Sequence, residues 1–364
     1  MKKALIITLY GNDNYGNKLQ NYALQQSIKK IDDAIDVTTI KVRYEKNIKN
    51  IFVYEIWKIL YSIKKIMKKS KIDPRKLNFI EFNKNYLKYS RKYIGTNSFK
   101  KIKGYDLYIY GSDQIWNPNG VGISKLFIGA LTNNNISYAA SIGANSIPSK
   151  YLDLYKKNIE KFKYVSVRED KGKEILNRII KNKNVDVLID PTMLLSSEEW
   201  DEITEKPIML KSDKYILNYF LGDLSNQRKK EIERIANKNN CEIINLLDSS
   251  SPFYTCGPSE FLYLEKNAFL ICTDSFHSSV FATLYNRPFI VFNREEKNMD
   301  NMESRLDTLI SKFKLKNRRY NGERITKENL EHDYSDAYKI LEKERKKSEY
   351  FLKKILKTED LNKK

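Results

Sequence analysis

The stretch TDSFHSSVFA, residues 273 to 282, places a histidine directly after the apolar run AFLIC. This is His277, one of only two histidines in the chain. An imidazole can give or take a proton near neutral pH. Asp274 or Ser275 can cap the helix that follows, and the first turn of a helix offers unpaired N–H groups to an anion such as phosphate. A histidine satisfied by neighbouring backbone is the commoner alternative, but the position at a strand end favours an acid beside a bound anion.

Three further loops carry polar residues after apolar, strand-like runs. The first is GNDNYGN, residues 11–17, where glycines let the backbone approach a ligand and asparagines offer donors and acceptors. Asp113 in GSDQIWNP can act as a base or orient a sugar hydroxyl, and Arg168 in YVSVRE can bind a carboxylate or phosphate. Each has an ordinary alternative: a tight turn, a helix cap at Asp113, or pairing of Arg168 with Glu169 or Asp170. Four such loops together indicate one ligand cleft more readily than four unrelated turns.

Two α/β units are needed to position these loops. The order strand, loop, helix recurs from Ala4 to Pro191 and starts again at Tyr215 with YILNYFLG. We therefore predict an α/β fold of two Rossmann-like domains that face each other across a cleft, followed by a charged C-terminal helix. The predicted domains are residues 1–195 and 212–325, with a helical tail at 326–364 and a linker at SSEEWDEITEKP.

Residues 45–95 interrupt this alternation as a basic amphipathic insertion. Within it, IFVYEIWKILYSIKKIMKKS, residues 51–70, carries an apolar stripe beside several lysines. A basic amphipathic helix can lie on an anionic membrane surface. Packing of the stripe against the protein's own sheet is the favoured alternative.

The composition predicts a cytoplasmic protein with reduced cysteines. No run approaches the roughly 20 apolar residues that a membrane span needs, and MKKALIITLY turns polar before it resembles a complete signal peptide. The three cysteines lack any CxxC spacing, which favours neither a disulfide framework nor a zinc site. Peripheral contact with the inner face of the membrane is a further expectation, carried by the basic insertion.

The formal net charge of +20 raises the question of a nucleic-acid partner. Lysine, isoleucine and asparagine are abundant along the whole chain, and the sequence contains no RNA-recognition, zinc-finger or helix-turn-helix signature. A basic surface that recruits anionic small molecules or an anionic membrane explains the charge as well. We therefore expect no specific nucleic-acid partner, and a non-catalytic basic binding protein remains an alternative.

Taken in order, seven motifs resemble the polysaccharide pyruvyl transferase family. They are GNDNYGNKLQNYAL, GYDLYIYGSDQIWNP, ISYAASIG, VSVRED, LIDPTMLL, the long stretch GPSEFLYLEKNAFLICTDSFHSSVFATLYNRPFIVFNR, and SRLDTLI. The resemblance covers about residues 4 to 313. It implies a GT-B-like fold in which phosphoenolpyruvate is the donor, and a sugar of an exopolysaccharide or capsule, or of its lipid-linked precursor, is the acceptor. The product is a pyruvate ketal with release of phosphate, and neither a redox cofactor nor an obligatory metal is required.

The resemblance also assigns roles to the loops. His277 is implied as the acid and Arg168 as a clamp for the donor, with the first domain as the acceptor side and the second as the donor side. Asp113, from its position after a strand, is the second expected catalytic residue. The expected donor-binding residues are Arg168, Ser275, Ser278 and Arg305. The expected acceptor-binding residues are Asn14, Gly16, Asn17, Gly111 and Ser112.

The sequence departs from the family at Ser275, because characterised members carry an arginine two residues before this histidine. Loss of one charge-assisted hydrogen bond would weaken donor binding by roughly 1.5 to 3 kcal/mol. Arg305, Arg294 and Arg287 all follow the histidine and could replace the missing guanidinium.

One alternative is a GT-B glycosyltransferase that uses a nucleotide sugar. Glu295 and Glu303 match an ExxxxxxxE spacing that such enzymes use, although chance explains the match in a chain so rich in charge. A metal enzyme is the least favoured reading, because His277 and His332 are far apart in sequence and no cysteine cluster accompanies them.

Overall fold

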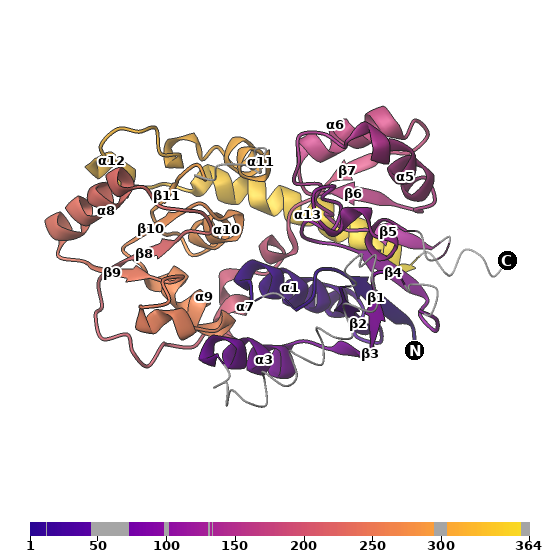
Figure 1. Cartoon of the computed structure of the whole chain (residues 1–364), viewed down its shortest axis with the longest axis horizontal. Coiled ribbons are helices and arrows are strands. Elements are labelled where there is room, and N and C mark those ends of the chain that lie inside the picture. The colour runs from indigo at the N-terminus through magenta and orange to yellow at the C-terminus, as the bar shows by residue number, and fades with distance from the viewer. Residues whose placement is uncertain are drawn as a thin grey trace, which may run out of the picture.

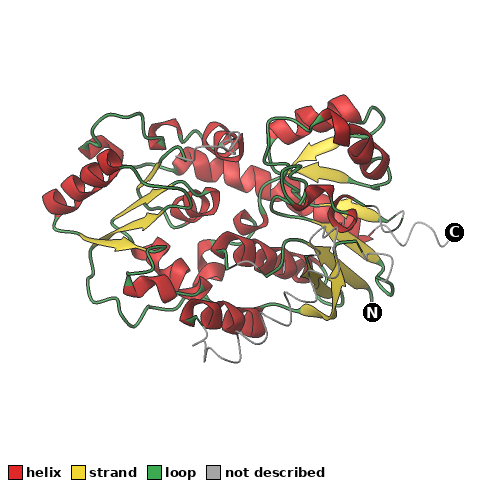
Figure 2. Ribbon diagram, viewed as in Figure 1, coloured by secondary structure: helices red, strands yellow, loops and turns green. Residues whose placement is uncertain are grey.

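Two parallel sheets form the framework of the protein (Figures 1 and 2). The computed structural model describes residues 1–11, 13–44, 73–97, 102–129, 132, 134–294 and 304–357. The first sheet has the order β3-β2-β1-β4-β5, and the second has the order β11-β10-β8-β9. The first is built from β1 (Lys3–Ile7), β2 (Asp36–Arg43), β3 (Tyr89–Gly95), β4 (Leu107–Tyr110) and β5 (Asn135–Ser137). The second is built from β8 (Tyr215–Tyr219), β9 (Glu242–Asn245), β10 (Leu270–Thr273) and β11 (Phe289–Val291).

A parallel pair extends the first sheet beyond β5. Strands β6 (Val165–Val167) and β7 (Val185–Val187) pair with each other, and an isolated bridge between Ile136 and Tyr164 places β6 beside β5. Most strand residues are buried on both faces, as in KALII and LYIY, because helices cover the sheets on either side. The α/β fold of two Rossmann-like halves is therefore confirmed.

Helices connect the strands and cover both sheets (Figure 2). The first half contains α1 (Tyr15–Ile31), α3 (Pro74–Tyr86), α4 (Lys125–Ile128), α5 (Ser149–Ile159) and α6 (Asp170–Ile179). The second half contains α8 (Asn226–Asn239), α9 (Pro258–Asn267), α10 (Phe276–Leu284), α11 (Ser304–Lys312) and α12 (Lys327–Leu330). Short 3₁₀ turns lie at Val121–Ile123, Pro191–Met193, Pro252–Thr255 and Lys316–Arg318.

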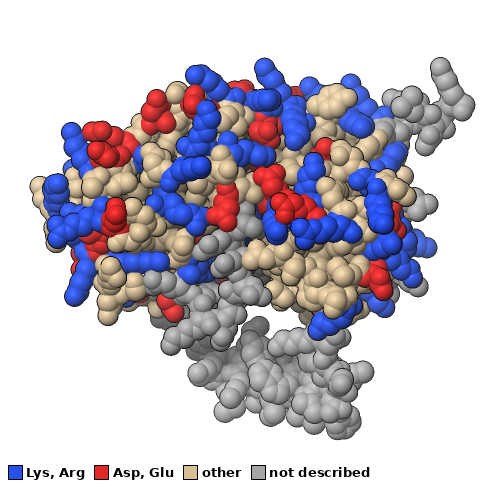
Figure 3. Space-filling view, turned by 90° about the horizontal axis from the view of Figure 1, so that it is seen from above, with Lys and Arg blue, Asp and Glu red and all other residues tan. Residues whose placement is uncertain are grey.

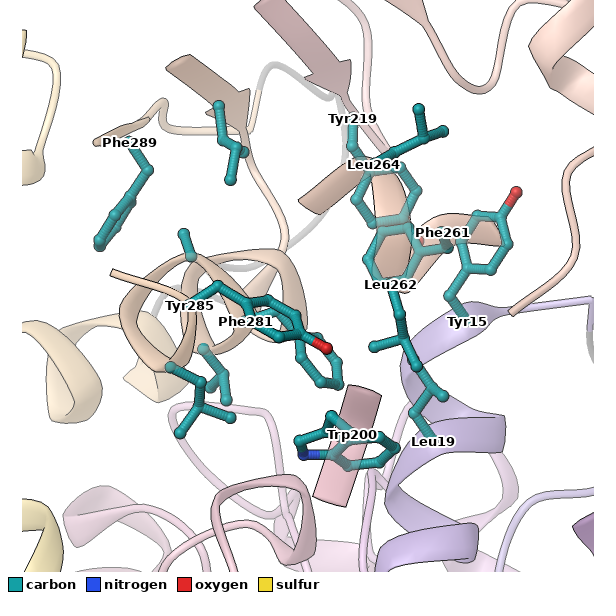
Figure 4. Close-up of a cluster of buried hydrophobic side chains, with 14 of the residues drawn as sticks. Tyr15, Leu19, Trp200, Tyr219, Phe261, Leu262, Leu264, Phe281, Tyr285 and Phe289 are labelled. Carbon is teal, nitrogen blue, oxygen red and sulfur yellow. The ribbon is translucent and has the colours of Figure 1, made fainter. Parts of the chain in front are cut away.

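An aromatic core joins the two halves (Figure 4). Tyr15, in the first turn of α1, stacks on Phe261 of α9 with ring centroids 4.5 Å apart. Trp200 packs edge-on against Phe281 of α10 at 5.1 Å. Because α1 comes from the first half and α9 and α10 from the second, this core fixes how the carboxyl edges of the two sheets meet.

The predicted linker is part of this core. SSEEWDEITEKP contains α7 (Ser197–Asp201), which begins with a capping box between Ser196 and Glu199. Trp200 of α7 is fully buried, and its indole N–H donates to the carbonyl of Thr192. The connection is therefore packed between the halves and is not an exposed tether.

The last helix, α13 (Ser335–Lys357), returns from the second half to the first sheet (Figure 1). Its Lys347 donates to the carbonyl of Val187 at 2.8 Å. Phe351 and Leu352 are buried in the cluster that contains Ala4 and Ile6 of β1. The charged C-terminal helix predicted from the sequence is thus a second connection between the halves.

The prediction of an insertion over residues 45–95 is wrong in its second part. Residues 74–86 form α3, and residues 89–95 form β3, which pairs with β2 in the first sheet. Strand β3 was missed because its sequence, YSRKYIG, is exposed at a sheet edge and shows no apolar run. The predicted amphipathic helix at 51–70 and the pair Glu295 and Glu303 lie outside the described residues and stay predictions.

Basic side chains are spread over the face seen in Figure 3, with acidic side chains among them. None of the helices in the described ranges is long and apolar enough to cross a membrane. All three cysteines are free, and Cys256 and Cys272 are buried.

Candidate functional site

The histidine singled out by the sequence lies where the two halves touch. His277 is in the first turn of α10, directly after β10, and Ser275 is the N-cap residue. Its ring packs against Gly16 in the first turn of α1, from the other half of the molecule. A methyl group at Gly16 would overlap the ring, so only glycine allows this approach. The histidine is 7% exposed and therefore sits in a largely dehydrated junction.

A buried carboxylate holds the basic groups of this junction. Asp190, at the end of the segment that follows β7, accepts a hydrogen bond from Arg168 Nη1 at 2.5 Å. The same oxygen lies 3.6 Å from Nε2 of His277 and accepts from the hydroxyl of Ser112 at 3.2 Å. The other oxygen accepts from the backbone N–H and the hydroxyl of Thr192. Burial alone would raise the pKa of Asp190, but the charges of His277 and Arg168 and these hydrogen bonds lower it.

A second carboxylate faces the same guanidinium. Asp113 follows β4, and its Oδ1 lies 3.9 Å from Nη2 of Arg168. Its Oδ2 accepts from the amide of Asn17 at 3.2 Å. The loop is shaped by Gly111, which has a φ of +127° and approaches the carbonyl of Tyr138 so closely that a side chain would collide with it. The peptide bond between Gly111 and Ser112 is cis.

Arg305 of α11 brings a second guanidinium from the second half. Burial and then the charge of Arg168 lower the pKa of Arg305 to about 10, although Asp113 and Glu169 oppose this change. The lowered pKa thus reflects poor solvation together with the like charges of Arg168 and Arg294. Arg168 also lies over the ring of Phe276, at 4.6 Å from its centroid.

Several nitrogen atoms of this cluster make no hydrogen bond within the described part of the chain. They are Nε and Nη2 of Arg168, Nε2 of His277 and Nε of Arg305, and all four are buried. Two of them face a carboxylate beyond hydrogen-bond distance: Nε2 of His277 lies 3.6 Å from Asp190, and Nη2 of Arg168 lies 3.9 Å from Asp113. Leaving buried donors without a hydrogen bond costs free energy, so such groups indicate a place where a ligand can bind. Two guanidinium groups and an imidazole with unused nitrogens form a site suited to a small anion that carries phosphate or carboxylate groups.

A comparison with protein-family models matches residues 14–296 to polysaccharide pyruvyl transferase. The chain belongs to this family. It is therefore a transferase of polysaccharide biosynthesis that acts on a sugar or polysaccharide acceptor. The match includes Gly16, Asp113, Arg168, Asp190 and His277 and ends before Arg305. A comparison with curated proteins gives no match.

Solved structures show the fold that this transferase shares. A protein from Listeria monocytogenes assigned as a UDP-N-acetylglucosamine 2-epimerase is 10% identical, with a TM-score of 0.50 over 97% of this chain and 90% of its own. The UDP-GlcNAc 2-epimerase from Neisseria meningitidis is 12% identical, with a TM-score of 0.43 over 98% of each chain. The similarity to the Listeria protein concerns only the arrangement of the two Rossmann-like halves.

The structure brings most of the predicted site residues of the transferase together. Gly16, Asn17, Ser112, Asp113, Arg168 and His277 are linked by direct contacts around Asp190 and Asp113. Asn14 caps α1 by accepting from the backbone N–H of Asn17. Ser275 contributes its backbone N–H to the hydroxyl of Thr273. The hydroxyl of Ser278 instead donates to the buried Glu265 at 2.6 Å, on the side of α10 that packs against α9.

Of the arginines considered as replacements at Ser275, Arg287 lies elsewhere, whereas Arg294 is close enough for its charge to lower the pKa of Arg305. Arg287 stands at the amino end of β11, whereas His277 follows the carboxyl end of β10, so the suggestion that Arg287 reaches the site is wrong. Arg294 follows the carboxyl end of β11 and pairs with Asp274 at 3.1 Å. Arg305 remains the arginine whose electrostatic neighbours include Arg168 and Asp113.

Sequence reasoning missed the two acidic residues that organise the site. Asp190 was visible in LIDPTMLL, as an acid between an apolar run and a proline. Glu169 accepts from the hydroxyl of Ser141 and from the backbone N–H groups of Ile142 and Gly143, which ties two strand ends together. In the ranges that the structure describes, no three His, Cys, Asp or Glu side chains come together in a way that could hold a metal ion.

Proposed function

We propose that this transferase moves the pyruvyl group of phosphoenolpyruvate onto two hydroxyls of a sugar in a cell-surface polysaccharide or its lipid-linked precursor. The observation that supports the proposal is the set of buried nitrogen atoms without a hydrogen bond on Arg168, His277 and Arg305. Phosphoenolpyruvate carries a phosphate and a carboxylate, so it has acceptors for all of these groups. The proposed product is a cyclic ketal, and inorganic phosphate is released.

The chemistry requires one proton donor and stabilisation of negative charge. The methylene carbon of phosphoenolpyruvate takes up a proton, and the adjacent carbon forms two new C–O bonds to the sugar while its bond to the phosphate oxygen breaks. Of the two hydroxyl protons, one is balanced by the new methyl hydrogen and the other leaves with phosphate. Acid catalysis and cationic stabilisation of the leaving group are thus the tasks of the protein.

The residues divide these tasks by position. His277 is the proposed acid, held 3.6 Å from the buried Asp190 carboxylate. Arg168 and Arg305 are the proposed clamps for the phosphate and carboxylate of the donor. Asp113, next to Arg168 and Asn17, is the proposed group that orients or deprotonates the sugar hydroxyl. Asp190 is a positioning residue, because it holds Arg168 and His277 and has no unused lone pair directed elsewhere.

Arg305 is the proposed replacement for the arginine that family members carry in place of Ser275. It belongs to α11, which packs against α10 and α6 and so joins the two halves beside the site. The hydroxyl of Thr308 on the same helix accepts from the N–H of Asp170 at 3.4 Å. A guanidinium held by α11 therefore reaches the junction from a different element than residue 275 would.

The test is release of phosphate from phosphoenolpyruvate in the presence of nucleotide-linked and lipid-linked sugars. We expect acceptor-dependent release that falls by about 10²- to 10⁴-fold in His277→Ala. His332→Ala is the matched control, since the second histidine lies 2.9 Å from the carbonyl of Asn286 in another part of the molecule. If no sugar triggers release and calorimetry detects no binding of phosphoenolpyruvate, the donor assignment is wrong, and nucleotide sugars become the next ligands to test.

A further inference from the structure

Four tyrosines gather on β3 and on the segments that directly follow β1 and β2, outside the cluster described above. The ring of Tyr10 packs edge-on against Tyr89 at 5.2 Å and against Tyr93 at 5.8 Å. The hydroxyls of Tyr10 and Tyr93 lie 3.2 Å apart, and the backbone N–H of Tyr10 donates to the hydroxyl of Tyr44 at 2.8 Å. Tyr93 is 52% exposed and Tyr44 is 40% exposed, so this tyrosine platform presents ring faces and hydroxyls to solvent.

A buried lysine lies against the tyrosine platform. Lys18, in the first turns of α1, is 2% exposed, and its ammonium lies 5.7 Å from the ring centroid of Tyr10. Within the residues that the structure describes, its ammonium forms no ion pair or hydrogen bond. Burial lowers the pKa of Lys18 to about 8, while Asp13 opposes this change. An ammonium on a largely buried lysine that has no hydrogen-bond partner in the described structure suits a site that a ligand completes.

The tyrosine platform is continuous with the reaction site. Lys18 directly follows Asn17, which donates to Asp113, and Gly16, which contacts His277. Burial raises the pKa of Tyr44, and the charge of Asp113 adds to this rise, so the phenol and the carboxylate lie near each other. A molecule resting on the tyrosines would thus place its polar groups beside Lys18 and Asp113.

We propose that Lys18 and the platform of Tyr10, Tyr44 and Tyr93 form the binding subsite for the pyranose ring of the acceptor. The inference rests on the proposed function, because it names where the sugar of that reaction binds. A pyranose has apolar C–H faces that pack on aromatic rings and a rim of hydroxyls that accept from an ammonium. A second anion is disfavoured here, because Asp113 and Asp13 already place negative charge beside the tyrosines and Lys18.

The test uses the full chain and methyl glycosides of glucose, galactose and mannose as probes. Saturation-transfer difference NMR titrations give their dissociation constants, and calorimetry gives the affinity for phosphoenolpyruvate in parallel. We expect at least one glycoside to bind and its affinity to fall about tenfold in Lys18→Met and in Tyr93→Ala. The controls are Lys29→Met, an exposed lysine in the last turn of the same helix, and Tyr350→Ala, a tyrosine 71% exposed on α13.

The outcomes separate this subsite from the donor reaction. Loss of glycoside binding in both variants, with an unchanged affinity for phosphoenolpyruvate, supports the subsite and also shows that the variants are folded. Glycoside binding that survives both substitutions, or wild-type protein that binds none of the three probes, overturns it. If wild-type protein binds a glycoside through these residues but does not bind phosphoenolpyruvate, the subsite stands and the proposed donor is wrong.

Discussion

Replacing Arg305 by methionine should raise the free energy of unfolding of the protein without ligand. The same change should weaken the binding of phosphoenolpyruvate. Arg305 is half-buried, its Nε has no hydrogen-bond partner in the described structure, and burial together with Arg168 lowers its pKa to about 10. The folded protein therefore holds this charge at a cost. Methionine keeps an unbranched, apolar stem of similar length and removes the charge.

The magnitude follows from the lowered pKa and from the bonds that a donor would make. Lowering the pKa of an arginine to about 10 corresponds to about 3 kcal/mol against its charged form, at 1.36 kcal/mol for each pH unit. Partial exposure and lost stem packing reduce this, so we expect a gain of about 1 kcal/mol in the free energy of unfolding. A lost charge-assisted hydrogen bond costs about 1.5 to 3 kcal/mol, which is roughly a 10- to 100-fold loss of affinity for phosphoenolpyruvate.

Urea denaturation with and without phosphoenolpyruvate, together with calorimetry, measures both effects. Arg287→Met is the matched control, because Arg287 also has a buried Nε without a partner among the described residues but stands at the opposite edge of the second sheet. It should leave the affinity unchanged. An Arg305→Met protein that is less stable and still binds phosphoenolpyruvate normally would refute the view that this guanidinium destabilises the unliganded protein and binds the donor anion.

Three further predictions follow from buried groups. Asp190→Asn removes the carboxylate that holds Arg168 and should lower the free energy of unfolding by about 3 to 5 kcal/mol at pH 7. Because the pKa of Asp190 is lowered in the folded state, the difference from wild type should shrink as the pH falls. The control Asp186→Asn should cost less than about 0.5 kcal/mol, and an equally small loss in Asp190→Asn would contradict the buried pair. Gly16→Ala should lower the melting temperature, although alanine normally favours a helix, because the methyl group meets the ring of His277. The control Gly172→Ala in α6, where the added atom makes ordinary contacts, should be neutral or slightly stabilising. A neutral result at Gly16 would exclude the close approach of Gly16 and the His277 ring. Burial raises the pKa of Glu265, so the stability that this residue contributes is present at low pH and is lost as the pH rises through its folded-state pKa. Glu265→Gln should therefore raise the melting temperature more at pH 8.5 than at pH 5. A gain that does not depend on pH would be inconsistent with a buried acid.

Local sequence was enough to predict the two α/β series and the strand-end loops. The run Ala4–Ile7 and the run AFLIC are apolar at every position, because strands covered on both faces exclude polar side chains. Each is followed by a polar loop and then by helical periodicity. Since parallel strands end at one edge of a sheet, the residues after them were expected to share a site, and His277, Asp113 and Arg168 do so.

Strand β3 and the linker escaped prediction because their environments depend on distant residues. YSRKYIG is mostly polar and becomes a strand because it pairs with β2 at the sheet edge. Trp200 lies in a stretch rich in acidic residues, yet it is fully buried because α10 packs over it. Neither contact leaves a local pattern, and propensity alone is overridden by tertiary packing.

The sequence by itself therefore determined the fold class, the family and the chemical types available at the strand ends. Only the tertiary structure decided which charged groups pair with each other. Asp190, which the sequence did not single out, lies between Arg168 and His277 because the two halves pack together. The tertiary structure also decided that Arg305 lies near the site while Arg287 does not. Arg287 stands at the amino end of β11, whereas Arg305 lies near Arg168. The physical reason is that burial and Coulomb interactions depend on distances in space, which residues far apart in the chain acquire only when both halves pack around their shared aromatic core.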